Sequence, residues 1–229
     1  MKNKLVSVLM STHNNANEIK SSIDSILNQT YRNLELLIVD DFSQDNTLEI
    51  IKSYKDGRIK YFQNKKNIGL TKSLNFLILQ SKGYYIARQD ADDISLKNRI
   101  ESQIEYMDKN QIEVCTTRAK NKQTDKKIPR ISFYIPNKIL IKFKNPFIHG
   151  SLIIKKDLLN KLGNYDENFY FAQDYKLFTE ILKKKIRIHT INETLYILNM
   201  SNNISTKYKE EQEHFAKCVR KELVPEKFK

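Results

Sequence analysis

The sequence predicts an α/β fold, in which a mostly parallel sheet is flanked by helices and followed by a smaller, less regular segment. Two observations support this prediction. Across the first 110 residues, short apolar runs without polar alternation are each followed by a helical pattern, as in parallel sheets covered on both faces. Each run also ends in polar or acidic residues, and such sheets bind ligands at the carboxyl ends of their strands.

The first half is expected to contain four strands that alternate with four helices. The strands are apolar runs too short for helices: residues 5–10, 34–39, 59–62 and 84–88. The helices place apolar side chains on one face, as Ile19, Ile23 and Ile26 do in the first of them. Their expected ranges are 14–28, 45–54, 70–79 and 95–109.

The second half is less regular, but no internal repeat or low-complexity linker interrupts it, so one folded unit is expected. The predicted strands are 112–116 and 147–154, followed by a hairpin of 186–191 and 194–198 around Asn192-Glu193. The stretch 118–130 is polar and basic, lacks periodicity and is expected to be a loop. The predicted helices are 139–143, 156–162 with Gly163 as C-cap, 175–182 and a charged terminal helix over 207–223.

The composition fits a large globular domain with a strong positive charge. A chain of 229 residues is long enough to bury a substantial core, and 29% charged residues is ordinary for such a domain. A formal net charge of +13 attracts nucleic acid, anionic membranes or phosphorylated small molecules. Because the basic residues recur along the chain, most are expected to be solvated surface; the alternative is a face that contacts an anionic bilayer.

The cysteines and the N-terminus predict a cytoplasmic protein, with at most peripheral contact to the inner face of the membrane. Cys115 and Cys218 are the only cysteines and belong to no Cys-x-x-Cys pair, which favours a reducing compartment. The apolar stretch after Leu5 is too short for the core of a signal peptide. No run of about 18 apolar residues occurs in the sequence.

Three carboxylates within four positions, Asp90, Asp92 and Asp93, follow the fourth predicted strand. Like charges this close repel one another unless a cation neutralises them. Residues two apart in an extended segment point the same way, so Asp90 and Asp92 face one site. Mg²⁺ or Mn²⁺ is often held by one or two carboxylates together with substrate phosphates, which makes this run a candidate metal site. The alternative is an acidic turn that caps the helix starting near Ser95.

Polar clusters follow all four predicted strands and are expected to converge at one edge of the sheet: residues 11–14, 40–41, 64–69 and 90–93. The chain has neither a Gly-x-Gly-x-x-Gly after the first strand nor a Gly-x-x-x-x-Gly-Lys-Ser/Thr motif. Dinucleotide binding and a P-loop are therefore unsupported. A diphosphate at this edge would be held mainly by a metal ion and side chains.

Several segments, in order, resemble glycosyltransferase family 2, whose members are inverting enzymes of the GT-A fold. The most recognisable run is 36–47, Leu-Leu-Ile-Val-Asp-Asp-Phe-Ser-Gln-Asp-Asn-Thr. The other matching segments are 6–14, 25–31, 64–69, 90–93, 163–167 and 173–177. The resemblance extends from Val6 to Ser205 and implies a Rossmann-like GT-A sheet with a smaller acceptor-side segment.

The resemblance implies donor-binding roles for five residues of the first half. Ser11 and His13 would line the nucleobase pocket, with the His13 ring stacked on a uracil-like base. Asp41 would accept hydrogen bonds from the base or ribose, and Asp90 would lie near the ribose. Asn67, in the loop 64–69, is a further substrate-binding position.

The remaining implied roles concern the metal ion and the acceptor. Asp92 would bind Mn²⁺ or Mg²⁺, which stabilises the leaving diphosphate, and Asp174 would be the base that removes the acceptor proton. The alternative for Asp174 is a helix cap. His149 would contact the acceptor or only hydrogen-bond to backbone. Many family members carry Arg and His where this chain has Leu198 and Met200. Either lysines replace that positive charge, or the metal ion and the donor bind more weakly.

The implied function is transfer of a hexosyl or N-acetylhexosaminyl group from a nucleoside-diphosphate donor, expected to be UDP-linked, to a hydroxyl of a glycan or lipid-linked glycan in bacterial surface polysaccharide synthesis. Residues 1–110 would be the nucleotide-sugar-binding half, 111–205 the acceptor-binding and catalytic half, and 206–229 a basic tail. Two alternatives stay open: a sugar-nucleotide-binding protein without turnover, and a metal-dependent nucleotidyltransferase. Nucleic-acid binding is not expected, because the basic residues are scattered and adjacent carboxylates repel phosphate.

Overall fold

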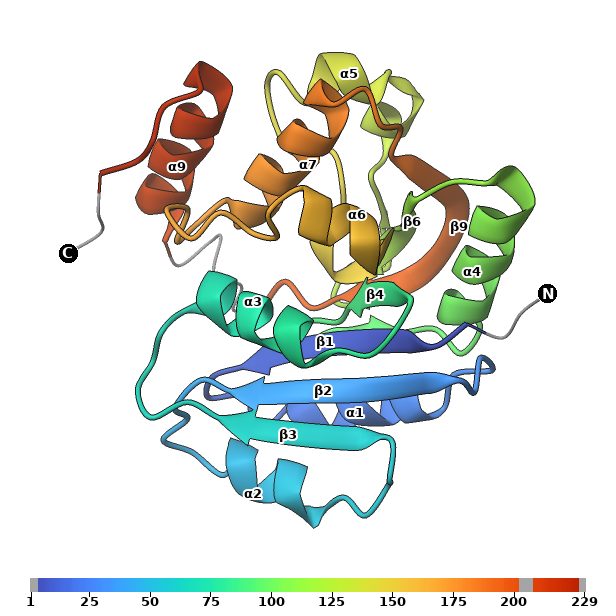
Figure 1. Cartoon of the computed structure of the whole chain (residues 1–229), viewed down its shortest axis with the longest axis vertical. Helices are drawn as coiled ribbons and strands as arrows, with labels where there is room; N and C mark the ends of the chain where they lie inside the picture. The colour runs from blue at the N-terminus through green and yellow to red at the C-terminus, as the bar shows by residue number, and fades with distance from the viewer. Residues whose placement is uncertain (1–3, 202–207, 227–229) are drawn as a thin grey trace.

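The computed structural model describes residues 4–201 and 208–226 and begins with alternating strands and helices (Figure 1). The strands are β1 (Val6–Thr12), β2 (Leu34–Asp40), β3 (Ile59–Gln63) and β4 (Tyr85–Arg88). They pair in parallel in the order β3-β2-β1-β4. The helices between them are α1 (Ile19–Leu27), α2 (Thr47–Ser53) and α3 (Leu70–Gln80). The parallel sheet predicted for the first half is confirmed.

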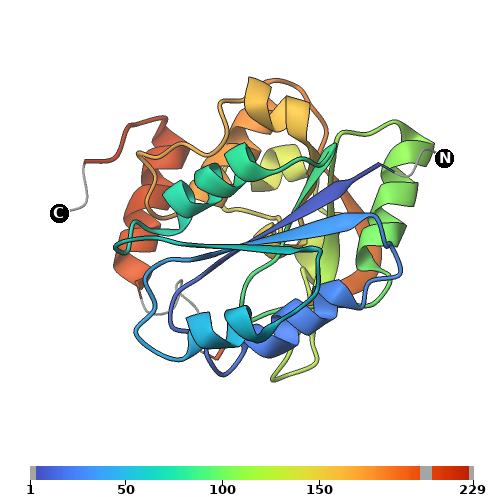
Figure 2. The ribbon, with the colours of Figure 1, turned by 60° about the horizontal axis from the view of Figure 1, so that its bottom comes forward.

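Helices cover both faces of this sheet, which explains why its strands show no polar alternation. On one face, Val8 and Met10 of β1 pack into a core with Ile23 of α1. On the other face, Leu9 packs into a second core with Leu74 of α3. Figure 2 shows α1 and α2 on one side of the sheet and α3 on the other.

The rest of the chain extends the sheet with strands of mixed direction. The added strands are β5 (Ile94–Ser95), β6 (Val114–Asn121), β7 (Lys127–Ile128), β8 (Ile153–Lys155) and β9 (His189–Leu198). The sheet order becomes β3-β2-β1-β4-β8-β6-β9-β5, with β7 paired to β6. Antiparallel pairs β4–β8, β6–β8 and β5–β9 join the parallel pair β6–β9.

Helices of the second half cover this extension. They are α4 (Arg99–Asn110), α5 (Asn137–Leu140), α6 (Lys156–Lys161), α7 (Gln173–Lys183) and α9 (Lys209–Lys221), with 3₁₀ turns η1 (Ile131–Tyr134) and η2 (His149–Ser151). Phe169 and Phe171, which precede α7, form a third core with Phe215 of α9. The predicted α/β class, with helices on a sheet and a smaller acceptor-side segment, is confirmed.

Two strand predictions for the second half are wrong because polar residues extend β6 and β9. The stretch 118–130, predicted as a loop, is one only in part: β6 continues to Asn121 and forms a short hairpin with β7, which is Lys127–Ile128. The residues 186–198 are not a hairpin, because β9 passes through Asn192-Glu193 with a register shift beside Arg118 of β6. Arg118 Nη1 donates to Asn192 Oδ1 at 2.9 Å, so the turn-like pair is an irregularity within one strand.

A third strand prediction, 147–154, is correct only at its end. Phe147 and Ile148 are buried but lead into η2, and β8 begins at Ile153. The η2 turn is fixed by Ser151, whose Oγ donates to the carbonyl of Ile148 at 2.9 Å. An apolar run therefore does not by itself distinguish a strand from a buried turn.

Some predicted helices are shorter at their starts. The helix predicted from Asn14 begins at Ile19, because the backbone before it bonds to the loop after β2. The helix predicted from Ser95 begins at Arg99 after the N-cap Asn98, since Ser95 belongs to β5. The run 90–93 therefore does not cap α4, which removes that alternative.

The predicted segments 111–205 and 206–229 both extend beyond the described residues. The predicted boundary between Ser205 and residue 206, and residue 207 at the start of the predicted terminal helix, lie outside them. Among the helices that the structure describes, none has both the length and the apolar character needed to span a bilayer.

Candidate active site

The loops that follow β1, β2 and β3 interlock at one edge of the sheet. The backbone N–H of Asn14 donates to Ser43 Oγ at 2.9 Å, and the N–H of Asn15 donates to Thr47 Oγ1 at 2.8 Å. The N–H of Asn64 donates to the carbonyl of Asp40 at 2.9 Å. Three of the four predicted polar clusters therefore meet, as strands that end at one sheet edge require.

Asp41 is buried at the centre of this interlock. Its Oδ1 accepts hydrogen bonds from Asn64 Nδ2 at 2.7 Å and from the N–H of Ile68 at 2.9 Å, and its Oδ2 accepts one from the N–H of Gly69 at 2.8 Å. Asp41 thus holds the loop 64–69 against the end of β2. Its implied contact with the base or ribose stays a prediction.

Gly69 is required at its position for two reasons. Its φ of +87° is one that side-chain-bearing residues rarely adopt, and an added Cβ would lie 2.5 Å from the ring of Tyr170. Tyr170 is 41% exposed, whereas its neighbours Phe169 and Phe171 are buried in the third core. Burial, and then the charge of Asp41, raises the pKa of the Tyr170 hydroxyl. One aromatic ring therefore lies open beside the donor-side loops.

The other implied donor-side residues lie at the same edge. Ser11 is half-buried in β1, and Asn67 is exposed in the loop after β3. His13 is exposed; its Nδ1 donates to the carbonyl of Asp41 at 2.9 Å and its Nε2 accepts from Asn14 Nδ2 at 3.1 Å. These two hydrogen bonds hold the ring in one orientation.

Asp90 is fixed by buried neighbours at the end of β4. Arg88 is fully buried and forms an ion pair with Asp90 Oδ1 through its Nη2, while its Nη1 donates to the carbonyl of Leu9 at 2.7 Å. The N–H of Asp90 donates to Tyr196 Oη at 3.1 Å. A Cβ on Gly150 would overlap Tyr196 Oη and lie 2.7 Å from Asp90 Oδ2, so the chain must be glycine there.

Asp92 and Asp93 lack comparable cationic partners. Burial, followed by the charge of Asp90, raises the pKa of Asp92 to about 6, and Glu18 at the start of α1 contributes to the rise. Burial also raises the pKa of Asp93, to which Asp90 and Asp92 add, although the N–H of Asn199 donates to Asp93 Oδ1 at 2.7 Å. The end of β4 therefore concentrates negative charge that the protein itself does not fully balance.

Asp174 comes from the first turn of α7 and lies within electrostatic range of Asp90. Its Oδ2 accepts from Asn145 Nδ2 at 2.7 Å, and its Oδ1 accepts from the N–H of Tyr175 at 2.7 Å. Burial raises the pKa of Asp174, and the charge of Asp90 raises it further. Ala172 is the N-cap of α7 and supplies no side-chain cap. Because Asp174 Oδ1 accepts from a first-turn N–H of α7, the helix-capping alternative stays open beside the catalytic one.

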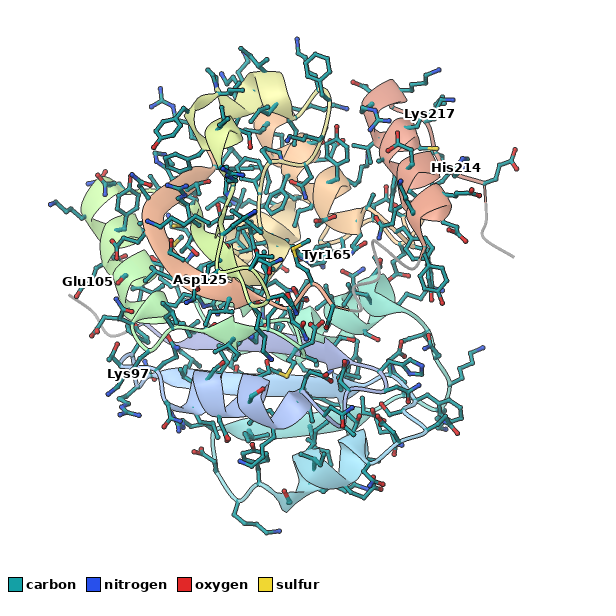
Figure 3. All side chains as sticks on the ribbon, turned by 180° about the vertical axis from the view of Figure 1, so that it is seen from behind. Lys97, Glu105, Asp125, Tyr165, His214 and Lys217 are labelled. Atoms are coloured by element: carbon teal, nitrogen blue, oxygen red, sulfur yellow. The ribbon has the colours of Figure 1, made fainter. Side chains whose placement is uncertain are left out.

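His149 lies between these acids and the core. Its Nε2 lies 2.7 Å from Tyr165 Oη, and its ring packs edge-on against Tyr165 and Phe178. Burial and then the nearby charge of Arg88 hold the pKa of His149 well below its ordinary value, so the ring is neutral. His149 therefore forms a hydrogen bond with a side chain, whereas the alternative predicted hydrogen bonds to backbone only. In Figure 3, Tyr165 lies near the middle of the molecule.

The donor set at the end of β4 fits a hard cation only if the substrate completes it. Among residues 4–201 and 208–226, no three His, Cys, Asp or Glu side chains are grouped to hold a metal ion. Asp92, with its raised pKa, would gain from a nearby cation, and Mg²⁺ or Mn²⁺ accepts one or two carboxylates when phosphate oxygens supply other ligands. Leu198 and Met200 add no ligand for a hard cation, and Met200 is 43% exposed.

Four residues of this site received no role from the sequence: Arg88, Asp93, Glu18 and Asn145. Arg88 had a detectable signal, since a charged residue in a short apolar strand must be paired when buried. Asp93 belonged to the acidic run but was given no function. Glu18 acts on Asp92 through its charge, Asn145 acts on Asp174 through a hydrogen bond, and no local pattern marks either residue.

Comparisons with known proteins agree with this geometry. The sequence model described as Glycosyl transferase family 2 matches residues 7–175. The Escherichia coli O-antigen biosynthesis glycosyltransferase WbnJ is 34% identical over 214 residues, which is 89% of this chain and 82% of that protein. The Escherichia coli UDP-Glc:alpha-D-GlcNAc-diphosphoundecaprenol beta-1,3-glucosyltransferase WfgD is 34% identical over 217 residues, 92% of this chain and 83% of that protein.

Solved structures show the same fold at lower identity. Residues 1–349 of Staphylococcus aureus TarS in complex with UDP-GlcNAc superimpose with a TM-score of 0.75 at 20% identity, covering 96% of this chain and 68% of that one. The chain spans only 39% of the longer TarS structure. A mannosyltransferase from Pyrobaculum calidifontis, PcManGT, in complex with GDP-Man and Mn²⁺, has a TM-score of 0.74 at 19% identity, covering 96% and 65%.

Proposed function

The chain belongs to glycosyltransferase family 2, and from this premise we propose that it is an inverting enzyme that moves a hexosyl or N-acetylhexosaminyl group from a UDP-linked donor to an acceptor hydroxyl. The observation that carries the proposal is the meeting of acids from distant parts of the chain. Asp90 and Asp92 follow β4, and Asp174 comes from α7 with a pKa raised by burial and by Asp90.

The donor would bind along the interlocked loops. His13 presents an oriented ring on which a base can stack, Ser11 lines the same edge, and Asn67 and Asp41 belong to the neighbouring loops. Asp90 would lie near the ribose. The UDP-GlcNAc complex of TarS, which shares this fold, supports a nucleoside-diphosphate sugar in this place.

Asp92 would hold Mn²⁺ or Mg²⁺ beside the diphosphate. When bound, such an ion stabilises the negative charge that develops on the leaving diphosphate. The protein itself would supply the Asp92 carboxylate, whose pKa is raised. Arg88 does not neutralise Asp92, because it forms its ion pair with Asp90. The Mn²⁺ in the PcManGT complex supports this cofactor class.

Asp174 would accept the proton of the acceptor hydroxyl as that oxygen bonds to the anomeric carbon and the diphosphate departs. Asn145 and the N–H of Tyr175 hold its two oxygens in place. His149, which is neutral and hydrogen-bonded to Tyr165, would line the acceptor side without contributing a positive charge.

The acceptor would be a glycan or a lipid-linked glycan in bacterial surface polysaccharide synthesis. The relative WfgD, named for a diphosphoundecaprenol acceptor, supports a lipid-linked one. We extend the proposal to a donor half (1–110), an acceptor half (111–205) and a basic tail (206–229), and to a cytoplasmic protein in peripheral contact with an anionic membrane. Nucleic acid is not proposed as a partner.

A second candidate is a donor-binding protein without turnover, which the apolar side chains at Leu198 and Met200 favour. A thermal-shift panel of nucleoside diphosphates, with and without Mn²⁺, followed by donor-hydrolysis assays, separates the two. The enzyme is expected to release UDP from its sugar nucleotide. Binding without release would favour the second candidate, and release of pyrophosphate from a nucleoside triphosphate would indicate a nucleotidyltransferase.

A further inference from the structure

Residues 130–144, which include η1 and α5, expose an unusual share of apolar surface; we name them the basic apolar segment. Ile131 is 79% exposed, Tyr134 76%, Ile139 52% and Phe143 69%. No other stretch of this length in the described residues exposes as many large apolar side chains. Exposed apolar groups gathered in this way indicate a contact surface.

The same segment is positively charged without compensation. Arg130, Lys138, Lys142 and Lys144 are all exposed, and the sequence has no Asp or Glu between Asp125 and Asp157. None of the ion pairs that the described residues form involves these four cations. The segment therefore combines apolar side chains with cations that have no anionic partner within the described chain.

One side of the segment packs against the rest of the protein, which holds its other side in a fixed position facing the solvent. Leu140 is buried, and the Tyr175 hydroxyl of α7 donates to the carbonyl of Ile141. The Arg118 guanidinium lies 4.7 Å from the centre of the Phe133 ring. These contacts fix one side of the segment on the sheet and on α7, while Ile139 and Phe143 stay outside.

The segment also leads directly to the predicted catalytic base. Asn145, the residue after its end, donates to Asp174 Oδ2, and Arg220 Nη1 of α9 donates to the carbonyl of Phe143 at 3.4 Å. In Figure 1 α5 lies at the top, far from α2 and β3 at the bottom, and Figure 3 shows Lys217 on α9 at the same end. This surface therefore borders the acceptor side of the site.

We propose that the basic apolar segment docks on an anionic lipid bilayer, with Phe143, Ile139 and Tyr134 in the headgroup region and the basic side chains on lipid phosphates. A bilayer surface accepts both chemistries at once: amphipathic side chains enter the interface, and cations gain from the negative surface potential. A second copy is a poor occupant, because each chain carries a net charge of +13 and this segment is uniformly positive. In placing the docked face next to a lipid-linked acceptor, the inference rests on the proposed function.

Vesicle sedimentation tests the charge requirement. The full chain is expected to bind phosphatidylglycerol-containing vesicles and not pure phosphatidylcholine vesicles. Lys138→Glu with Lys142→Glu should weaken that binding by about 30-fold or more, given the usual contribution of each cation near an anionic surface. The matched control is Lys52→Glu with Lys55→Glu, which changes net charge equally at exposed positions in and after α2, at the other end of the molecule. Equal losses in both pairs would overturn the proposal.

The absence of tryptophan from the sequence allows a direct test of insertion. Phe143→Trp places a single fluorophore in the segment, and its emission should shift to the blue when anionic vesicles are added. Tyr61→Trp, at a 48% exposed position in β3, is the control and should not shift. An unshifted Trp at position 143 would contradict insertion.

Apolar truncation gives a second variant pair. Ile139→Ser with Phe143→Ser should reduce vesicle binding about tenfold, whereas Leu79→Ser, at a 74% exposed position, should not. Sedimentation velocity on the same proteins must show unchanged monomers; a dimer that dissociates in Phe143→Ser would instead assign the face to a second copy. Donor hydrolysis in the absence of vesicles is expected to be unchanged in these variants, so loss of docking is distinguishable from failure of the proposed function.

Discussion

Two acidic clusters lie at the same edge of the sheet, and the protein treats them in opposite ways. After β2, Asp41 accepts three hydrogen bonds, from Asn64, Ile68 and Gly69, and these hold the loop 64–69 in place. After β4, the pKa values of Asp92 and Asp93 are raised, first by burial and then by neighbouring carboxylates. One cluster is satisfied by the fold, and the other is left short of positive charge.

The difference indicates which carboxylates are available for chemistry. A carboxylate surrounded by backbone N–H groups gains stability from ionisation and is a structural element. A buried carboxylate next to like charges is costly to keep ionised and is typical of functional sites. Asp174 belongs with the second group, because burial and Asp90 raise its pKa as well.

The largest expected effect concerns Asp174. Asp174→Asn keeps the shape of the side chain but cannot accept a proton, so transfer to the acceptor should fall by about 10²- to 10⁴-fold. Donor affinity, measured by thermal shift with UDP-sugar and Mn²⁺, should change little. If Asp174→Asn loses donor binding instead, Asp174 belongs to the structural class and the comparison between the clusters fails.

Asp92→Ala tests the unsatisfied cluster at its predicted cation position. Nucleotide binding in Mn²⁺ should weaken by roughly 100-fold, at the upper end of what losing a group around a bound metal costs. Nucleotide binding in excess EDTA should be the same for wild type and variant. The measurement is isothermal titration with UDP; an equal affinity of both proteins in Mn²⁺ would remove Asp92 from the metal site.

Stability should separate the clusters by sign. Asp41→Asn leaves N–H donors of the loop 64–69 without a charged acceptor and should cost about 2–3 kcal/mol of unfolding free energy. Asp92→Asn, in metal-free buffer at pH 7, removes a carboxylate whose ionised form is disfavoured by burial, so it should be neutral or stabilising. Urea unfolding of both variants gives the answer. Equal destabilisation of both variants would contradict the difference between the acidic clusters after β2 and β4.

The sequence predicts the parallel half of the fold because burial on both faces leaves a local signature. Apolar runs such as that of β2 are too short for helices, and Ile19, Ile23 and Ile26 mark the covering helix α1. The second half lacks this signature. Asn192-Glu193 has turn composition, yet β6 pairs on both sides of it and Arg118 satisfies Asn192, which is information that only the tertiary structure contains.

The site divides in the same way. Asp41, Asp90, Asp92 and Asp174 were predicted because they belong to recognisable runs. Asp41 follows β2, Asp90 and Asp92 follow β4, and Asp174 lies within electrostatic range of Asp90. The different surroundings of these carboxylates could not be predicted from the sequence, because they depend on residues far away in the chain. The charge of Glu18, just before α1, affects Asp92, and Asn145 is hydrogen-bonded to Asp174 across 29 positions of the chain.

The smallest expected effect concerns that last contact. A base must be ionised to act, so transfer should be lost as pH falls through the pKa of Asp174, which burial, and then Asp90, hold above the ordinary 3.8. The Asn145 hydrogen bond opposes this rise, since it favours the ionised form. Asn145→Ala should therefore move the acidic limb of the pH profile of kcat to higher pH while leaving the rate at alkaline pH within a few-fold. Asn168→Ala, at an exposed position in the loop before α7, is the matched control and should leave the limb in place. An unmoved limb in Asn145→Ala would mean that the limb reports a group other than Asp174.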